Sequence, residues 1–216
     1  MTEGLLRSIE SRAARTREAL ERMDLAAVLR LVERLYAAYE SGSRVFVFGN
    51  GGSAAAASHF AEDLSKGALP EFPSEKRLRA HSLADPMPFL TALANDCGYE
   101  SVFREQLATH ASAGDLAIAI SGSGSSPNVL AAIRWAKEHG LFTCGMTGFD
   151  GGRLRELVDL SIHAPVDDME IAENCHMVAM HLAVAGLRER IRAARVTEAS
   201  EGPRGCAPRP GAGPRP

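Results

Sequence analysis

A glycine-rich turn between an apolar segment and a small-residue helix is the feature that most restricts the fold of this chain. It lies in residues 43–67, SRVFVFGNGGSAAAASHFAEDLSKG, where residues 45–48 predict a short buried strand. The glycines from 49 to 52 allow a sharp turn, and Ser53 is expected to cap the following helix. The N-H groups and positive dipole at a helix start attract anions, so the turn predicts a phosphate site. An ordinary strand-to-helix connection is the alternative.

The same design recurs at residues 114–140, GDLAIAISGSGSSPNVLAAIRWAKEHG. Residues 116–120 form a continuous apolar strand, a loop of serine and glycine follows, and Pro127 stands where the first turn of a helix accepts proline. The backbone N-H groups and serine hydroxyls of the loop can donate to a phosphate, or they can simply satisfy the loop's own backbone. Two such loops in one sheet favour an anion site.

The rest of the chain alternates strands and helices. Apolar segments at 141–146 and 160–164 predict further strands, and helical patterns cover 87–94, 99–110, 153–158 and 169–195. This alternation predicts an α/β fold, a three-layer sandwich with a parallel sheet covered on both faces. Ligands of such sheets gather at the carboxyl ends of the strands, so we expect the loops at 49–53 and 121–126 to meet in one pocket.

Two amphipathic helices, at 2–23 and 24–39, precede the first strand. Asp24 is the expected N-cap of the second helix, whose predicted buried face is Leu25, Val28, Leu31, Val32 and Leu35. We therefore divide the chain into a helical segment at 1–42, which packs on the domain or on another subunit, an α/β domain at 43–195, which the family resemblance given below identifies as phosphosugar-binding, and a disordered tail rich in glycine, proline and arginine at 196–216.

Composition excludes several classes of partner. The net charge of -3 and a pI of about 6.2 give no indication of a nucleic-acid or anionic membrane surface. The N-terminal residues lack the pattern of a signal peptide, and no apolar segment approaches the roughly 20 residues that span a bilayer, so a cytoplasmic protein is expected. The four cysteines form no CxxC pair and are expected to be reduced thiols.

Titratable residues concentrate on two helices. His59 and Asp63 are four residues apart, so they project from one helix face and can share a metal ion or a proton relay, or form an ordinary surface pair. Glu173 and His181 are eight residues apart on the last helix, about 12 Å along its axis at 1.5 Å per residue. Both can reach one ion only by converging or by coming from different subunits. His176 is expected to be a core histidine. Imidazole and carboxylate ligands suit zinc or another divalent metal.

The chain resembles the SIS (sugar isomerase) domain family, and within it the phosphoheptose isomerase branch. The similarity covers about residues 5–195 and is carried by FGNGGSAAAASHFAEDL, LANDCGYE, AISGSGSSPNV, MTGFDGG and ENCHMVAMH. It implies a flavodoxin-like, Rossmann-like sheet, a homotetramer with shared active sites, and conversion of sedoheptulose 7-phosphate into a heptose 7-phosphate. The implied substrate contacts are Asn50, Gly51, Ser53, Asp96, Ser121, Ser123 and Ser126; the catalytic residues Asp63, His181 and Glu173; and the metal ligands His59, Asp63, Glu173 and His181.

Four positions depart from the family pattern. The family usually has Glu at the position of Asp63, Gln at that of Glu173, a basic residue at that of Gly67 and Thr at that of Gly122. Shortening a carboxylate by one methylene moves it by roughly 1 Å, which matters for proton transfer. Two alternatives therefore stay open: an isomerase of a different phosphosugar in a specialised pathway, and a non-catalytic phosphosugar-binding adaptor. Retention of His181 and of an acid at Asp63 favours catalysis over the second.

Overall fold

The computed structural model describes residues 2–74 and 76–201 and contains a five-stranded sheet in the order β2-β1-β3-β4-β5. Every neighbouring pair of strands is parallel. The strands are β1 (Arg44–Gly49), β2 (Arg79–Ser82), β3 (Leu116–Ile120), β4 (Phe142–Thr147) and β5 (Leu160–His163). This order is the flavodoxin-like one, whose ligands bind beyond the carboxyl ends of β1 and β3, where the strand order reverses. The predicted α/β fold is confirmed.

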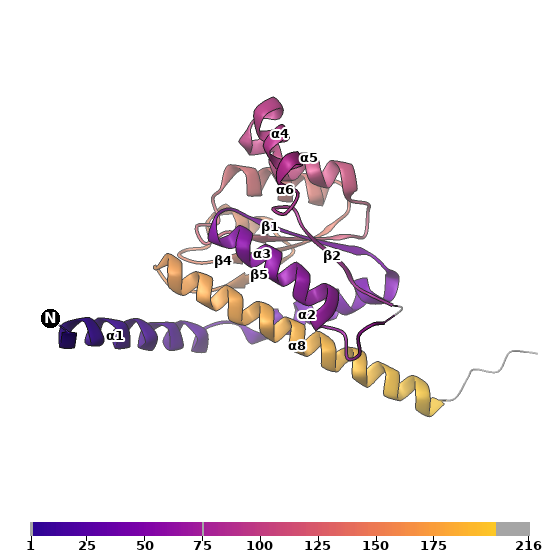
Figure 1. Cartoon of the computed structure of the whole chain (residues 1–216), viewed down its shortest axis with the longest axis horizontal. Coiled ribbons are helices and arrows are strands. Elements are labelled where there is room, and N and C mark those ends of the chain that lie inside the picture. Colours follow the sequence, from indigo (N-terminus) through magenta and orange to yellow (C-terminus); the bar gives the residue numbers. More distant parts are fainter. Residues whose placement is uncertain (1, 75, 202–216) are drawn as a thin grey trace, which may run out of the picture.

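Helices cover both faces of the sheet, as Figure 1 shows. The alternating side chains of the central strands divide the core in two. Val45, Val47 and Ile118 face a cluster built with α2 (Leu25–Ser41), α3 (Gly52–Glu62) and α8 (Met169–Glu201). Phe46 and Phe48 face a second cluster built with α5 (Val102–His110), α6 (Pro127–Glu138) and α7 (Gly152–Leu157). The result is a three-layer sandwich that holds the carboxyl ends of the strands, and the loops after them, in place.

The N-terminal helices differ in how they pack. Asp24 caps α2 as predicted, its carboxylate accepting from the Ala26 N-H at 2.9 Å, and the predicted buried face is correct except for Leu25, which is 58% exposed. Leu25 is the first residue of the helix, where a side chain can extend past the packed face. α1 (Thr2–Glu21) reaches out to one side of the molecule, at the end where α8 begins (Figure 1). Among the described residues of α1, Ala19 alone is buried.

Several boundaries differ from the sequence expectations. α4 (Met87–Cys97) continues past Asn95 and ends at Cys97, and the Gly98 that follows has a φ of +82°, which suits glycine. A 3₁₀ turn, η2 (Tyr99–Ser101), then precedes α5, and a single π-helical turn, η1 (Asp63–Gly67), follows α3. α8 continues to Glu201, so the first residues assigned to the tail are helical. Positions 202–216 of the expected tail lie outside the described residues, and the three-part division of the chain stays a prediction.

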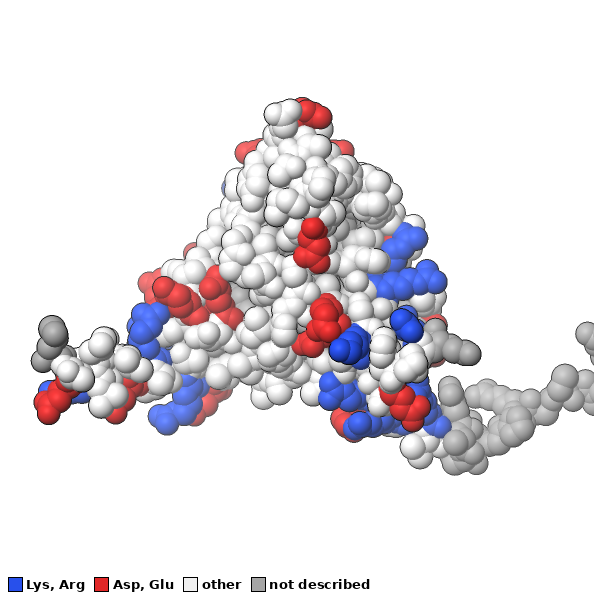
Figure 2. All heavy atoms as spheres, viewed as in Figure 1, with Lys and Arg blue, Asp and Glu red and all other residues white. Residues whose placement is uncertain are grey.

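The surface carries charges of both signs, and the cysteines that the structure describes are free. On the face drawn in Figure 2, acidic and basic side chains are interspersed along the half of the molecule that holds α1 and α8. None of the helices in the described ranges is both long enough and apolar enough to cross a membrane. Cys97, Cys144 and Cys175 are free thiols, and Cys206 lies outside the described residues.

Candidate functional site

The two predicted loops meet in one pocket at the carboxyl ends of β1 and β3. The pocket has a volume of about 210 Å³. Its lining contains five of the seven expected substrate contacts and one of the expected catalytic residues, and the full set is Asn50, Ser53, Ile120, Ser121, Gly122, Ser123, Ser126, Met169 and Glu173. We call this hollow the anion pocket, because hydroxyls and the N-terminal ends of α3 and α6 surround it.

The first loop is shaped by close backbone approach. A Cβ on Gly49 would lie 2.5 Å from the Ile120 carbonyl oxygen, and Gly51 has a φ of +54°, so both positions require glycine. The expectation that Ser53 caps α3 is wrong: Gly51 occupies the cap position and Ser53 is the second residue of the helix. This happens because the turn closes earlier, at residues 50 and 51. Ser53 is instead buried and lines the anion pocket.

The second loop offers hydroxyls that its own helix does not use. Ser126 stands at the N-cap of α6 but makes no side-chain capping bond within the described chain. Its hydroxyl lies 3.4 Å from that of Ser121, and both line the pocket. A Cβ on Gly124 would lie 1.9 Å from the Gly151 carbonyl oxygen, so the TGFDGG segment packs directly against this loop. The serine hydroxyls are therefore held toward the pocket by a backbone that cannot shift easily.

Gly122, where the family usually carries threonine, lies against the start of α8. A Cβ added to Gly122 would lie 2.4 Å from the Met169 sulfur. Met169 lines the anion pocket and is 40% exposed. A thioether therefore occupies the space beside the loop that a threonine side chain would need.

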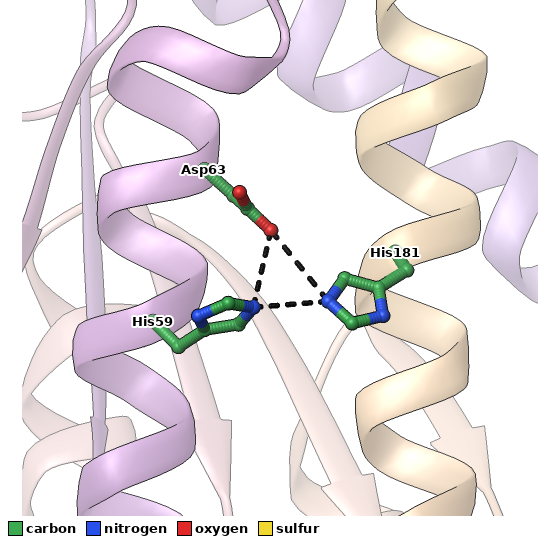
Figure 3. A group of neighbouring side chains, drawn as sticks. All are labelled: His59, Asp63 and His181. Carbon is green, nitrogen blue, oxygen red and sulfur yellow. Dashed lines mark hydrogen bonds and ion pairs between the residues drawn. The ribbon is translucent and has the colours of Figure 1, made fainter.

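A second group of titratable side chains lies farther along α8. Figure 3 shows His59 and Asp63, from α3 and the turn after it, facing His181 of α8. The two histidine Nε2 atoms are 2.9 Å apart, and Asp63 Oδ2 lies 3.4 Å from His59 Nε2 and 3.7 Å from His181 Nε2. One ligand atom from each residue lies within 4.8 Å of the others, an arrangement that can hold a metal ion. We call this group the His-Asp-His cluster.

Local structure places Asp63 for this role. Asp63 begins the π-helical turn η1, and such turns are frequent at functional sites. A Cβ on Gly67 would lie only 3.1 Å from Asp63 Oδ1, so the glycine leaves room for the carboxylate. The family's basic residue is absent here, but Arg188 of α8 reaches the same turn and donates from Nε to the Gly67 carbonyl at 2.8 Å.

Glu173 does not join the His-Asp-His cluster in this chain. Its carboxylate lies at the anion pocket, where a Cβ on Gly52 would be 2.6 Å from Glu173 Oε1. The cluster that can hold a metal in the described chain consists of His59, Asp63 and His181. Glu173 and His181 lie on different turns of α8, eight residues apart, so Glu173 of the same chain stays outside this group. A four-residue ligand set that includes Glu173 stays a prediction.

The remaining expected residues lie outside both the lining of the anion pocket and the His-Asp-His cluster. Asp96 is exposed at the end of α4, accepts from Asn95 Nδ2 at 2.7 Å, and is not part of the pocket lining. Gly51 shapes the first loop without lining the pocket. His176 is 1% exposed, in agreement with a core histidine, and burial lowers its pKa.

Three residues that the sequence analysis did not single out belong to the site. Met169 lines the anion pocket, and Asn128 and Tyr99 both hydrogen-bond to the Asn50 side chain. Tyr99 stands in the LANDCGYE segment and Asn128 in the AISGSGSSPNV segment, so both lie within motifs that carry the family resemblance. No periodic signal marks Met169, which enters the pocket only because α8 begins there.

Comparisons with known proteins agree with this geometry. Residues 10–148 match the family model described as SIS domain. A phosphoheptose isomerase of Pelobacter propionicus is 40% identical over 153 residues, covering 70% of this chain and 79% of that protein. One from Mycobacterium tuberculosis (strain ATCC 25177 / H37Ra) is 40% identical over 173 residues, covering 80% and 87%. The solved phosphoheptose isomerase of Neisseria gonorrhoeae superposes with a TM-score of 0.79 at 25% identity, covering 88% of this chain and 100% of that one.

Proposed function

This chain belongs to the SIS domain family, in its phosphoheptose isomerase branch, and we propose that it is an aldose-ketose isomerase converting sedoheptulose 7-phosphate into D-glycero-D-manno-heptose 7-phosphate. The observation that carries the proposal is the anion pocket, in which two serine and glycine loops meet beside a carboxylate. The similarity to phosphoheptose isomerases supports a phosphoheptose as the substrate.

The phosphate group of the sugar is assigned to the anion pocket. Hydroxyls of Ser53, Ser121, Ser123 and Ser126 line it, and α3 and α6 begin at its rim. Oriented hydroxyls and helix N-termini favour a dianion without requiring lysine or arginine. Anchoring the phosphate fixes one end of the open-chain sugar, so that the reacting carbons are held in position.

The length of the substrate connects the anion pocket to the His-Asp-His cluster. Eight bonds separate the phosphorus of sedoheptulose 7-phosphate from C1, which at roughly 1.2 Å per bond in an extended chain is about 10 Å. Glu173, at the pocket, and His181, in the cluster, are about 12 Å apart along α8. A seven-carbon sugar phosphate therefore matches the spacing between phosphate loops and cluster within one chain.

Proton transfer is assigned to the carboxylates and to His181. The isomerisation moves a proton between C1 and C2 through an enediol, while the oxygens on these carbons exchange a proton. Asp63 lies 3.7 Å from His181 Nε2, so carboxylate and imidazole can act on neighbouring atoms. Glu173 lies at the phosphate end of the substrate within one chain, so it is the alternative base only if another subunit brings it to the reacting carbons.

The His-Asp-His cluster fits a divalent metal, and we propose zinc. Ligand atoms of tetrahedral zinc lie about 3.3 Å from one another. The distances of 2.9, 3.4 and 3.7 Å between the three donor atoms are close to this value. His59, Asp63 and His181 would hold the ion, and when bound it would polarise the sugar carbonyl. Glu173 would complete the expected set only if it came from another subunit.

A homotetramer with shared active sites is part of the proposal. Leu5, Leu6 and Ile9 on α1 are between 54% and 63% exposed. Val178 and Leu182, which flank His181 on α8, are 36% and 45% exposed. Apolar side chains around a catalytic histidine favour cover by a second subunit. A mass measurement in solution tests this, and a monomer with full activity contradicts it.

The test of the activity is direct. Purified protein is incubated with sedoheptulose 7-phosphate, with added zinc or with a chelator, and aldose formation is followed. We expect turnover that the chelator lowers and zinc restores. The absence of turnover under all these conditions, together with activity on another phosphosugar, would overturn the substrate assignment.

Because a phosphate dianion does not cross a bilayer unaided, we place the reaction in the cytoplasm.

A further inference from the structure

Three side chains from separate parts of the chain form a hydrogen-bonded network beside the anion pocket. Asn50 and Asn128 exchange two bonds, the Nδ2 of each donating to the Oδ1 of the other at 2.9 Å. The Tyr99 hydroxyl donates to Asn50 Oδ1, also at 2.9 Å. Asn50 lines the pocket, Asn128 is buried in the first turn of α6, and Tyr99 belongs to the turn after α4.

The orientation of both amides follows from one backbone group. The Val129 N-H donates to Asn128 Oδ1 at 3.0 Å. A backbone N-H can only donate, so the Asn128 atom that it contacts must be oxygen. The other end of that amide is then Nδ2, which needs an acceptor, so the facing atom of Asn50 is also oxygen. The network therefore admits a single assignment of oxygen and nitrogen.

This assignment leaves Asn50 with one kind of free hydrogen-bonding group. An amide oxygen has two lone pairs, and those of Asn50 accept from Asn128 and from Tyr99. One of the two Nδ2 hydrogens is donated to Asn128. The group left for a ligand is a single N-H, which is a donor suited to a phosphate oxygen.

We propose that Tyr99 is a positioning residue for phosphate binding. Its hydroxyl takes the second lone pair of Asn50 and ties η2 to the first loop, so that Asn50 presents only an N-H to the phosphate. This role rests on the proposed function, because the bound phosphate is taken to be the phosphate group of the sugar substrate. Tyr99 is 55% exposed, so loss of its hydroxyl alone leaves the core intact.

The test is Tyr99→Phe, with Tyr36→Phe as the matched control. Tyr36 lies on α2, its ring stacked under Arg190 at 3.9 Å, and it does not line the anion pocket. Calorimetry should show a Kd for inorganic phosphate that rises roughly three- to tenfold in Tyr99→Phe, as expected for one hydrogen bond, and stays unchanged in Tyr36→Phe. KM for the phosphosugar should rise by the same factor, with kcat within about twofold.

Some outcomes of this test would contradict the role of Tyr99, and one would contradict only the proposed substrate. Equal phosphate affinity in Tyr99→Phe and Tyr36→Phe, or no phosphate binding by the unmodified protein, overturns the proposal. A loss in kcat at unchanged KM does so too, because the hydroxyl would then act in the chemistry. The expected rise in phosphate Kd without turnover of sedoheptulose 7-phosphate supports the role of Tyr99 and contradicts the proposed substrate.

A double-mutant cycle tests whether Tyr99 acts through Asn50. In an Asn50→Ala background we expect Tyr99→Phe to leave phosphate affinity unchanged, since the group that it positions is absent. The same three- to tenfold loss in that background would mean that Tyr99 binds the ligand by itself, which would overturn the positioning role. Thermal unfolding of each variant verifies that it is folded at the assay temperature.

Discussion

Asp63 and Glu173 are the two carboxylates that can move a proton in the proposed reaction, and their surroundings differ. Asp63 faces two histidines within 3.7 Å, whereas Glu173 lies at a pocket assigned to a dianion. A carboxylate beside imidazoles is suited to metal binding and proton transfer. A carboxylate beside a bound phosphate repels it. The two residues should therefore respond to mutation in different ways.

For Asp63→Asn we expect loss of both metal binding and activity. The amide keeps the size of the side chain but removes its charge and its ability to accept a proton. kcat/KM should fall roughly 10²- to 10⁴-fold, the range for loss of a general acid or base, and zinc affinity should fall in a direct titration. Glu62→Gln, which removes a neighbouring acid outside the His-Asp-His cluster, is the control. Equal activity in the two variants would contradict the role of Asp63.

For Glu173→Gln, the residue usual in the family, we expect tighter phosphate binding. Removing a negative charge from the anion pocket removes its repulsion of the ligand, so the Kd for inorganic phosphate should fall several-fold. Glu170→Gln, on the exposed first turn of the same helix, is the control. If kcat for the phosphosugar also falls about 100-fold or more, Glu173 is the base. If kcat is retained, the base is Asp63. Unchanged phosphate affinity would show that Glu173 does not face the bound anion.

At the scale of elements, the contact between α2 and α8 holds the site together. α8 carries Met169, Glu173 and His181, and its Gly186 packs against Val32 of α2. A Cβ on Gly186 would lie 2.9 Å from Val32 Cγ2, and Val32 is buried and stiff at χ1. The small residue lets the two helices approach closely and so fixes the height of α8 over the sheet.

We therefore predict that Gly186→Leu destabilises the fold. The added side chain must push α2 and α8 apart, which should lower the free energy of unfolding by about 1–3 kcal/mol. Gly4→Leu is the matched control, because nothing lies within 4 Å of a Cβ at that position of α1. Urea denaturation of both variants checks this, and similar midpoints would show that the contact between α2 and α8 is not tight.

For the whole molecule, histidines with lowered pKa values make stability depend on pH. Burial lowers the pKa of His176, and the nearby His163 adds to this effect, while the Thr147 backbone opposes it. Burial also lowers the pKa of His81, with Arg44 adding to the effect, and the pKa of His163, where Arg155 adds to the effect while Thr147 and Asp150 oppose it. These rings bind protons more weakly in the folded state than in the unfolded state, for which 6.5 is the ordinary value.

The sign of the effect follows from linkage. Below about pH 6.5 the unfolded chain binds more protons than the folded one, so we expect the free energy of unfolding to fall as pH falls. The slope is up to about 1.4 kcal/mol per pH unit for the buried His176. It is smaller for His81 and His163, which are more exposed and screened by solvent. The lowered pKa values of Asp159 and Asp168 act only below their ordinary value of 3.8. Urea denaturation at pH 7.5, 6.5 and 5.5 measures the slope, which His176→Leu should reduce. Identical slopes would contradict the prediction.

Much of the fold is predictable because its signals are local. Asp24 caps its helix, residues 116–120 form the predicted strand, and the two glycine and serine loops meet as the topology of a parallel sheet requires. The errors occur where local signals compete. Ser53 is a good cap residue, but a preceding glycine closes the turn first, and Leu25 matches the helix period but lies at the helix end.

The sequence by itself determined the α/β class, the two loops, and the residue types available for phosphate and metal binding, because strand and helix periods and glycine turns are encoded over a few neighbouring residues. Only the tertiary structure decided which of these residues meet. His59 and His181 are 122 positions apart and come within 2.9 Å because α3 and α8 pack side by side on one face of the sheet. The same packing places Glu173 at the anion pocket, away from the His-Asp-His cluster, since a straight helix cannot bring residues eight positions apart to one point.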